Sequence, residues 1–281
     1  FRKAAEQLNV SVSVLEWNCL EEAIRNGRLE GAAVKIDPPS YSTFELSVMK
    51  EMIKEYQRCL QKLENVNCTF LNSPTSIATV LDKRECKLRM QVQGIPVTQM
   101  LSETVQNVEQ LFELMERERI FSVFIKPTFF SGAAGVIAFR IHPRSKKMTA
   151  HTSCHMTAGK LINTKTLYYM EDQKEITSLL NAVLQLDVTV ERWYPKSQFQ
   201  GKSYDLRAVY QLGHIAYMVV RQSNGPVTNL HLNNQALDIG RLALDEAAMD
   251  ELEGICRAAV NLFPGLSVAG IDILLEKNTG K

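Results

Sequence analysis

One segment, Val123–Ile141, constrains the fold of this chain more than any other. It reads as an apolar strand that ends at Lys126-Pro127, a loop of small residues from Ser131 to Gly135, and a second apolar strand. Gly132 and Gly135 allow the backbone to approach a ligand closely, and successive amide N–H groups in such a loop can hold a phosphate. The Lys126 ammonium would add a positive charge. The segment therefore predicts a strand–loop–strand unit that clamps an anion such as a nucleotide phosphate.

The same segment also fits a simpler structure, a glycine-containing β-hairpin whose terminal lysine pairs with a carboxylate. Two other nucleotide folds are excluded. The chain contains neither the GxxxxGK of a P-loop followed by Ser or Thr, nor the GxGxxG of a dinucleotide-binding fold. The choice between a hairpin and a phosphate loop depends on the motifs elsewhere in the chain.

The composition of the chain excludes several classes of protein. Lys and Arg total 32 against 31 Asp and Glu, so the near-neutral molecule shows no electrostatic footprint for nucleic acid. No run of about 18 apolar residues is present, which argues against a membrane protein. The 6 cysteines are scattered without CxxC pairs, which indicates reduced thiols in the cytoplasm. At 281 residues, 45% of them hydrophobic, we expect two or three lobes.

The first part of the chain alternates helical and strand patterns. The predicted elements are the strands Val10–Leu15 and Ala32–Ile36 and the helices Phe44–Leu63 and Arg84–Gln93. After the helix Asn107–Arg119, short apolar strands dominate the pattern. These strands are Ser122–Ile125, Gly135–Ile141, Met148–Ser153, Val188–Glu191, Leu206–Gln211 and Ile215–Arg221, followed by the helix Asp245–Asn261 and the strand Ser267–Leu275. We expect an N-terminal lobe over 1–80, a central lobe over 81–187 and a C-terminal lobe over 188–281.

Several short motifs follow one another beyond residue 70. They are Leu81-Asp82-Lys83, Gly94-Ile95-Pro96-Val97-Thr98, Phe124-Ile125-Lys126-Pro127 with its glycine loop, Val190-Glu191-Arg192-Trp193-Tyr194, Tyr204-Asp205-Leu206-Arg207, Asn229-Leu230-His231 and Gly270-Ile271-Asp272-Ile273-Leu274. In this order they resemble the ATP-grasp superfamily and, within it, the RimK-like carboxylate–amine ligases. The matching features there are a DK dipeptide, a GIPVP-T segment, a phosphate loop, an adenine hinge, a DIR motif, an NLHRGG segment and a GVDIL strand. Each motif alone is weak, but a collinear series over roughly residues 70–275 seldom arises by chance.

The resemblance implies a role for each motif. Lys83 and Lys126 would neutralise the ATP phosphates beneath the loop of Ser131, Gly132 and Gly135. The hinge residues Glu191, Arg192, Trp193 and Tyr194 would hold the adenine. Asp205 would also bind the cofactor. Arg207 and Arg221 would stabilise the charge that builds on the transferring phosphoryl group, and Asp272 would be a ligand of Mg²⁺. Taken singly, the lysine, arginine and aspartate positions also fit a helix N-terminus, solvated strand positions and a turn cap.

Two departures from the family pattern lead us to expect different substrate and nucleotide contacts. The hinge reads Glu191-Arg192-Trp193 where the pattern has Gln-Glu-Phe, and His231 is followed by Leu-Asn-Asn instead of Arg-Gly-Gly. The other two metal ligands of the family lie in a Glu-x-Asn motif after the GVDIL strand. We expect that segment of this protein to lie beyond Lys281. A zinc site at His151, Cys154 and His155 is a weak alternative, because side chains along one strand need not converge.

We therefore predict an α/β ATP-grasp fold with an N-terminal α/β lobe, a central lid lobe and a C-terminal lobe on a mixed or antiparallel sheet. ATP would lie between the last two lobes. The predicted function is an ATP- and Mg²⁺-dependent carboxylate–amine ligase that acts through an acyl phosphate on small-molecule or peptide acids and amines. Two alternatives stay open: a small-molecule kinase on the same fold, and a non-catalytic ATP-binding protein. The sequence leaves the oligomeric state open.

Overall fold

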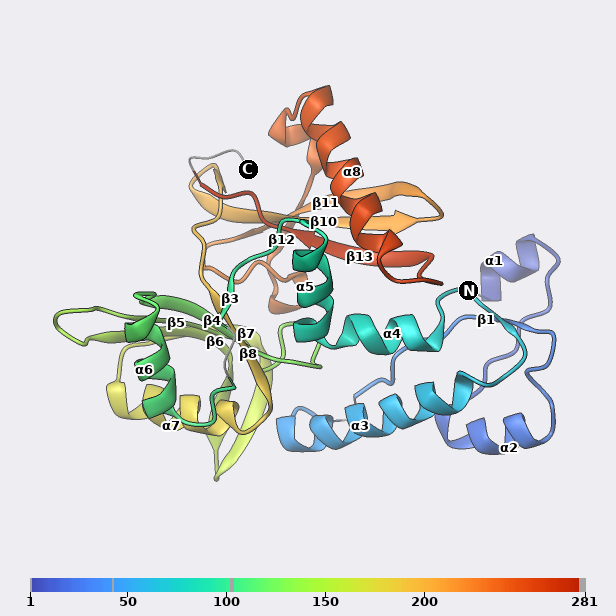
Figure 1. Ribbon diagram of the computed structural model, residues 1–281, viewed down its shortest axis with the longest axis horizontal. Coiled ribbons are helices and arrows are strands. Elements are labelled where there is room, and N and C mark those ends of the chain that lie inside the picture. The colour runs from blue at the N-terminus through green and yellow to red at the C-terminus, as the bar shows by residue number, and fades with distance from the viewer. Residues whose placement is uncertain (1, 42, 102–103, 278–281) are drawn as a thin grey trace.

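The computed structural model describes residues 2–41, 43–101 and 104–277, with the Arg2 side chain excepted. Two larger antiparallel sheets lie next to each other, and a small α/β unit precedes them in the chain (Figure 1). In the described ranges no helix has both the length and the apolar character needed to cross a membrane. All six cysteines are free thiols.

The N-terminal unit is built around one long helix. Its elements are α1 Arg2–Gln7, α2 Leu20–Arg25, α3 Leu46–Leu63 and the parallel pair β1 Ala33–Val34 and β2 Thr69–Phe70. The first half of α3 buries Leu46 and Met49 in the core of the central sheet, and its last turns bury Cys59 and Leu63 in a separate small cluster. The helix therefore joins two cores through a single apolar face, as its sequence period predicts.

The strand predicted at Val10–Leu15 is wrong. The segment has no regular secondary structure, and Val10 and Val14 are 56% and 61% exposed. Alternating Val and Ser residues favour an extended backbone, but a strand is stable only with a hydrogen-bonded neighbour. Within the described part of the chain this segment pairs with no strand.

Two short helices lead into the central sheet. Ser73 caps α4 Pro74–Leu81 by accepting the Ser76 N–H at 3.2 Å, and Asp82 caps α5 Lys83–Val92 by accepting two N–H groups at 2.9 and 3.0 Å. These caps fix where α5 starts, and Lys83 is its first residue. The side chain of Asn72 binds the backbone of residues 267 and 268, which ties this region to the C-terminal sheet.

The central sheet has six antiparallel strands in the order β3-β8-β4-β5-β6-β7. Their bounds are β3 Met100–Leu101, β4 Ser122–Pro127, β5 Ile137–Ile141, β6 Met148–Thr157, β7 Lys160–Met170 and β8 Val188–Arg192. The helices α6 Val108–Arg117 and α7 Gln173–Leu184 pack on one face against Val123, Ile125 and Phe139. Alternation along the strands turns Lys126 and Glu191 to the opposite face. The lobe division expected at 187/188 falls directly before β8, whose partners are all in this sheet.

The C-terminal sheet is also antiparallel, in the order β12-β11-β10-β13 with β9 beside β10. Its strands are β9 Gln198–Phe199, β10 Lys202–Gln211, β11 His214–Ser223, β12 Gln235–Asp238 and β13 Val268–Ile273, and the helix α8 Glu246–Asn261 packs on its outer face (Figure 1). Leu206 and Ala208 join Leu252 and Cys256 of α8 in a second core. The intervening residues of these strands point to the opposite face of the sheet, which we call its inner face.

A β-bulge sets which side chains share that inner face. At the turn Leu212-Gly213, Gln211 pairs with His214, and this register alone would put Arg221 opposite Tyr204. A register shift between Val209 and Tyr210 instead pairs Arg221 with Asp205. Since alternate residues of a strand point the same way, Asp205, Arg207 and Arg221 all project from one face.

Candidate functional site

The loop Ser131–Gly135 connects β4 to β5 and presents backbone donors. Gly132, Ala133 and Gly135 all have positive φ, at 66°, 65° and 68°. The N–H groups of Ser131, Gly132 and Ala133 have no acceptor among the described residues, whereas the Ala134 N–H donates to the Ser131 carbonyl at 3.1 Å. Three successive free N–H groups around left-handed residues form the kind of concave surface that binds anions.

The second half of this loop is fixed by packing. A Cβ at Gly135 would lie 2.8 Å from Cγ of Pro127 and 3.1 Å from Cδ1 of Leu46, so only glycine fits the close approach. The Ser153 hydroxyl donates to the Ala133 carbonyl at 2.6 Å, and Ala134 is buried. The free donors therefore lie at the end of the loop that is less tightly held.

Lys83 holds the chain that leads into the loop. Its Nζ donates to the carbonyl oxygens of Pro127 at 2.9 Å and Thr128 at 3.0 Å, and to that of Phe130. Burial lowers the pKa of Lys83 to about 8, with a smaller contribution from the nearby Lys126. A lysine has three N–H donors, so none is left for the phosphate contact that the sequence interpretation gave this residue.

Glu191 holds two lysines on the inner face of the central sheet. Its Oε2 lies 2.7 Å from Nζ of Lys126 and 2.6 Å from Nζ of Lys87, and it accepts the Thr98 hydroxyl at 2.9 Å. Burial would raise the pKa of Glu191, but the ammonium groups of Lys126 and Lys87 hold it at about 2. Its other oxygen, Oε1, is buried without a partner among the described residues. The sequence interpretation missed Lys87, although it lies one helical turn after Lys83.

The hinge after β8 leaves one backbone donor free. The Arg192 N–H donates to Gln99 at 2.8 Å and the Trp193 N–H to Ser122 at 3.0 Å, while the Tyr194 N–H has no acceptor in the described ranges. The Trp193 ring packs 5.5 Å from the Phe124 ring. The indole of Trp193 therefore lies against a strand of the central sheet.

Asp205 is fully occupied inside the C-terminal sheet. Its Oδ1 lies 2.7 Å from Nε of Arg221, and its Oδ2 lies 2.8 Å from Nζ of Lys196 and accepts the Thr228 hydroxyl. Lys196, Asp205 and Arg221 have exposed side-chain fractions of 10%, 9% and 8%. Burial would raise the pKa of Asp205, but Lys196 and Arg221 lower it below its ordinary value. Asp205 therefore orients these two cations, with both of its oxygens hydrogen-bonded within the protein.

Asp272 links the two arginines at the edge of this network. Its Oδ1 lies 2.7 Å from Nη1 of Arg207 and 3.0 Å from Nη1 of Arg221. A Cβ at Gly270 would overlap with the Arg207 guanidinium, so the glycine makes room for this side chain to cross β13. The carboxylate of Asp272 is 53% exposed, and Oδ2 has no partner among the described residues.

A complete metal site is not formed by the described residues. They contain no group of three or more His, Cys, Asp or Glu side chains that could hold a metal, so His151, Cys154 and His155 form no zinc site there. Asp272 offers one free carboxylate oxygen. Mg²⁺ binds several oxygen ligands, so Asp272 alone does not complete the site. The triplet Glu276-Lys277-Asn278 spells Glu-x-Asn, which the sequence interpretation passed over, but Asn278 lies outside the described residues.

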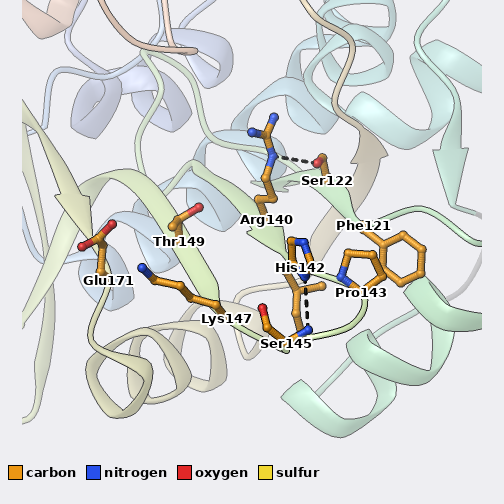
Figure 2. A pocket seen from close by; sticks show the side chains of 10 residues that line it. Phe121, Ser122, Arg140, His142, Pro143, Ser145, Lys147, Thr149 and Glu171 are labelled. Atoms are coloured by element: carbon orange, nitrogen blue, oxygen red, sulfur yellow. Dashed lines mark hydrogen bonds between the residues drawn. The ribbon is translucent and has the colours of Figure 1, made fainter.

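A separate hollow of about 320 Å³ lies at the rim of the central sheet (Figure 2). Arg140 lines it, donates to the Ser122 hydroxyl at 3.0 Å and places its guanidinium 4.6 Å from the Trp193 ring. None of the predicted site residues lines this hollow. The candidate site therefore lies on the inner faces of the two sheets and not in this hollow.

Solved structures resemble the whole arrangement. No family model matches the chain, and no curated protein matches its sequence. The D-cycloserine synthetase DcsG aligns with 98% of this chain and 80% of its own, with a TM-score of 0.60 and 13% identity. The chain has the ATP-grasp fold.

Two further structures show the same ATP-grasp fold. The D-alanine–D-alanine ligase from Bacillus anthracis, solved with ATP, has a TM-score of 0.54 at 12% identity and covers 95% of this chain and 71% of its own. The ADP complex of PurK, a carboxyaminoimidazole ribonucleotide synthetase, has a TM-score of 0.55 at 11% identity and covers 94% of this chain. This chain spans only 55% of the PurK chain. These likenesses confirm the predicted fold, and the RimK-like branch stays a prediction.

Proposed function

We propose that the protein is an ATP-dependent carboxylate–amine ligase that works through an acyl phosphate. The observation that carries this proposal is that each of the two sheets presents cationic groups or free N–H donors. The free N–H groups of the loop and Lys126 lie on the central sheet, and Arg207 and Arg221 project from the C-terminal sheet. A triphosphate between the two sheets would meet donors from both. The fold is also that of a synthetase and a ligase, DcsG and the D-alanine–D-alanine ligase.

The adenine would lie at the hinge. The buried, unpartnered Oε1 of Glu191 can accept a hydrogen bond from the exocyclic amino group of adenine, and the free Tyr194 N–H can donate to a ring nitrogen. A buried acceptor left without a donor costs about 1–3 kcal/mol, so a ligand that supplies the donor is favoured. Guanine presents a carbonyl oxygen at that position, which would repel the carboxylate. The site therefore favours ATP over GTP.

The phosphates would lie across the free loop amides and Lys126. Lys126 donates to Glu191 and keeps N–H groups for a phosphate oxygen, since the pair uses only one short contact. Because Glu191 also holds Lys126, it would connect adenine recognition with phosphate binding. Mg²⁺ bound with the nucleotide would neutralise part of the phosphate charge, with Asp272 as one carboxylate ligand.

The chemical step follows from the arginines opposite. A substrate carboxylate oxygen forms a bond to the γ-phosphorus while the bond to the ADP oxygen breaks, which gives ADP and an acyl phosphate. The amine then attacks the acyl carbon, phosphate leaves with the bonding electron pair, and the amine loses a proton. Arg207 and Arg221 would bind the phosphoryl oxygens as negative charge spreads over them. Preorganised donors of this kind lower the barrier because they need no rearrangement during reaction.

A screen of acid and amine pairs for ADP release, followed by mass analysis of products, tests the proposal. A ligase releases ADP only when both an acid and an amine are present, and the product mass is that of the two minus water. ADP release with a hydroxyl compound alone, which gains the mass of a phosphoryl group, would identify a kinase and contradict the ligase assignment. ATP binding without turnover on any pair would favour a non-catalytic protein.

A further inference from the structure

Lys196 is a buried cation that no motif of the sequence singled out. It follows the hinge, and its backbone forms a bridge with Glu276 just after β13. Its Nζ lies 2.8 Å from Asp205 Oδ2 and donates to the Thr228 hydroxyl at 2.6 Å. Its side chain is 10% exposed. Two of the three ammonium donors are thus used, and the third has no acceptor among the described residues.

Lys196 and Arg221 both bind the carboxylate of Asp205, so two cations lie side by side in the C-terminal sheet. Burial lowers the pKa of Lys196, and although Asp205 opposes this change, Arg221 and Lys126 add to the lowering. The two networks together contain six cations and three carboxylates, namely Lys83, Lys87, Lys126, Lys196, Arg207 and Arg221 with Glu191, Asp205 and Asp272. This excess of positive charge matches a polyanion held between the sheets.

We propose that Lys196 is a further lysine that binds the nucleotide polyphosphate, through the one N–H that the protein leaves free. The inference rests on the proposed nucleotide site and assigns a further residue to it. Lys196 is suited because Asp205 and Thr228 fix its ammonium while leaving one donor unpaired. A phosphate oxygen would relieve the repulsion among Lys196, Lys126 and Arg221.

The first test compares the affinities of Mg·ATP, Mg·ADP and AMP by titration calorimetry for the wild type and Lys196→Met. The control is Lys174→Met, which removes an exposed lysine at the start of α7. We expect Lys196→Met to weaken ATP binding at least tenfold and AMP binding less than twofold, with no change in the control. A lysine with only a structural role would weaken both nucleotides alike or neither. Either of those outcomes for Lys196→Met would overturn the inference.

A second test needs only the wild-type protein and so remains decisive if Lys196→Met fails to fold. An adenosine polyphosphate that ends in pyridoxal places an aldehyde at the end of the phosphate chain. The lysine amine there adds to the aldehyde with loss of water, and borohydride reduces the imine to a stable amine. Peptide mass mapping should find the label on Lys196, with protection by ATP. A label on Lys83 and none on Lys196 would overturn the inference.

The two proposals fail in different ways. If the wild-type protein binds none of the adenine nucleotides, the proposed function falls and this inference falls with it. If the wild type binds ATP more tightly than AMP and Lys196→Met keeps that difference, only the inference on Lys196 is overturned. Both measurements read binding and not turnover, so they do not depend on the identity of the acid and amine.

Discussion

Arg207 and Arg221 share the carboxylate of Asp272, but they differ in burial. The Arg221 side chain is 8% exposed and also holds Asp205, whereas the Arg207 side chain is 40% exposed. Replacing Arg221 therefore disturbs a buried ion pair, and removal of one partner of such a pair is strongly destabilising. Arg207 is the cleaner probe of the reaction, and residue-scale tests should begin there.

We predict that Arg207→Ala lowers turnover about a hundredfold, because loss of one transition-state donor costs on the order of 3 kcal/mol. ATP affinity should change little, since the guanidinium binds most strongly once charge has built up. Lysine should rescue only in part because it lacks the planar fork. The matched control is Arg257→Ala, an exposed arginine on α8. Near-normal turnover of Arg207→Ala with an identified substrate pair would refute the placement of the reaction beside β10.

A substitution at Gly270 is a second way to perturb Arg207. A methyl group at this position would displace the Arg207 guanidinium, which is the flexible end of a side chain, so the fold should tolerate the change. We predict that Gly270→Ala lowers turnover at least tenfold, or about 1.4 kcal/mol, while the melting temperature stays within a few degrees. Gly254→Ala is the control, since a Cβ there meets nothing within 4 Å. Unchanged turnover of Gly270→Ala would show that the position of Arg207 is unimportant.

The ion pairs of Glu191 lead to a prediction about how the stability of the fold depends on pH. Its pKa is held at about 2, below the ordinary 4.5, so the ion pairs with Lys126 and Lys87 stabilise the fold above about pH 4.5 and lose that effect as pH falls towards 2. In urea titrations the stability difference between wild type and Glu191→Gln should shrink by about 3 kcal/mol between about pH 5 and pH 2. The exposed Glu113→Gln is the control. A difference that is constant over this range would contradict the buried ion pairs.

At the scale of elements, the glycine loop has two halves that should respond differently to nucleotide. The N–H groups of residues 131–133 are free, whereas those of Ala134, Gly135 and Val136 already have acceptors within the protein. We predict that Mg·ATP slows hydrogen exchange at residues 131–133 and changes residues 134–136 little. Equal exchange at 131–133 with and without nucleotide would argue against phosphate binding by this loop.

The sequence predicted most elements of this fold because their patterns are strong. The face of α3 and the caps at Ser73 and Asp82 follow from helical period and side-chain chemistry. The helix α7 was missed, although Asp172 and apolar residues at 176, 179, 180 and 183 signal it clearly. The strand β7 is harder to find, since it has one neighbour in the sheet and most of its residues are only partly buried.

The arrangement of the site was less predictable than its residues. The order of motifs gave the candidates. Arg207 and Arg221 share a face of the sheet only because the bulge at Val209/Tyr210 shifts the register that the two-residue turn sets. No motif indicates a bulge, the three carbonyl contacts of Lys83, or the burial of Lys196. Such features depend on side-chain packing across lobes that are far apart in sequence.

At the scale of the whole molecule, the proposed function requires two separate sheets to bind one nucleotide. The central sheet would supply the loop, Lys126 and Glu191, and the C-terminal sheet would supply Lys196 and the arginines. A ligand that binds both sheets should stabilise the folded chain as a unit, by about 2.7 kcal/mol when its concentration is a hundredfold above the dissociation constant. The acceptor Oε1 of Glu191 and the donor N–H of Tyr194, which would contact the base, should also make binding depend on the base.

Titration calorimetry of the wild-type protein with Mg·ATP and with Mg·GTP tests this claim most directly. We predict saturable one-site binding of ATP and at least tenfold weaker binding of GTP, because the guanine carbonyl would face the unpaired Oε1 of Glu191. The chain should also keep this preference when neither acid nor amine is present. An absence of binding heat with Mg·ATP at millimolar concentration would contradict a nucleotide site between the two sheets.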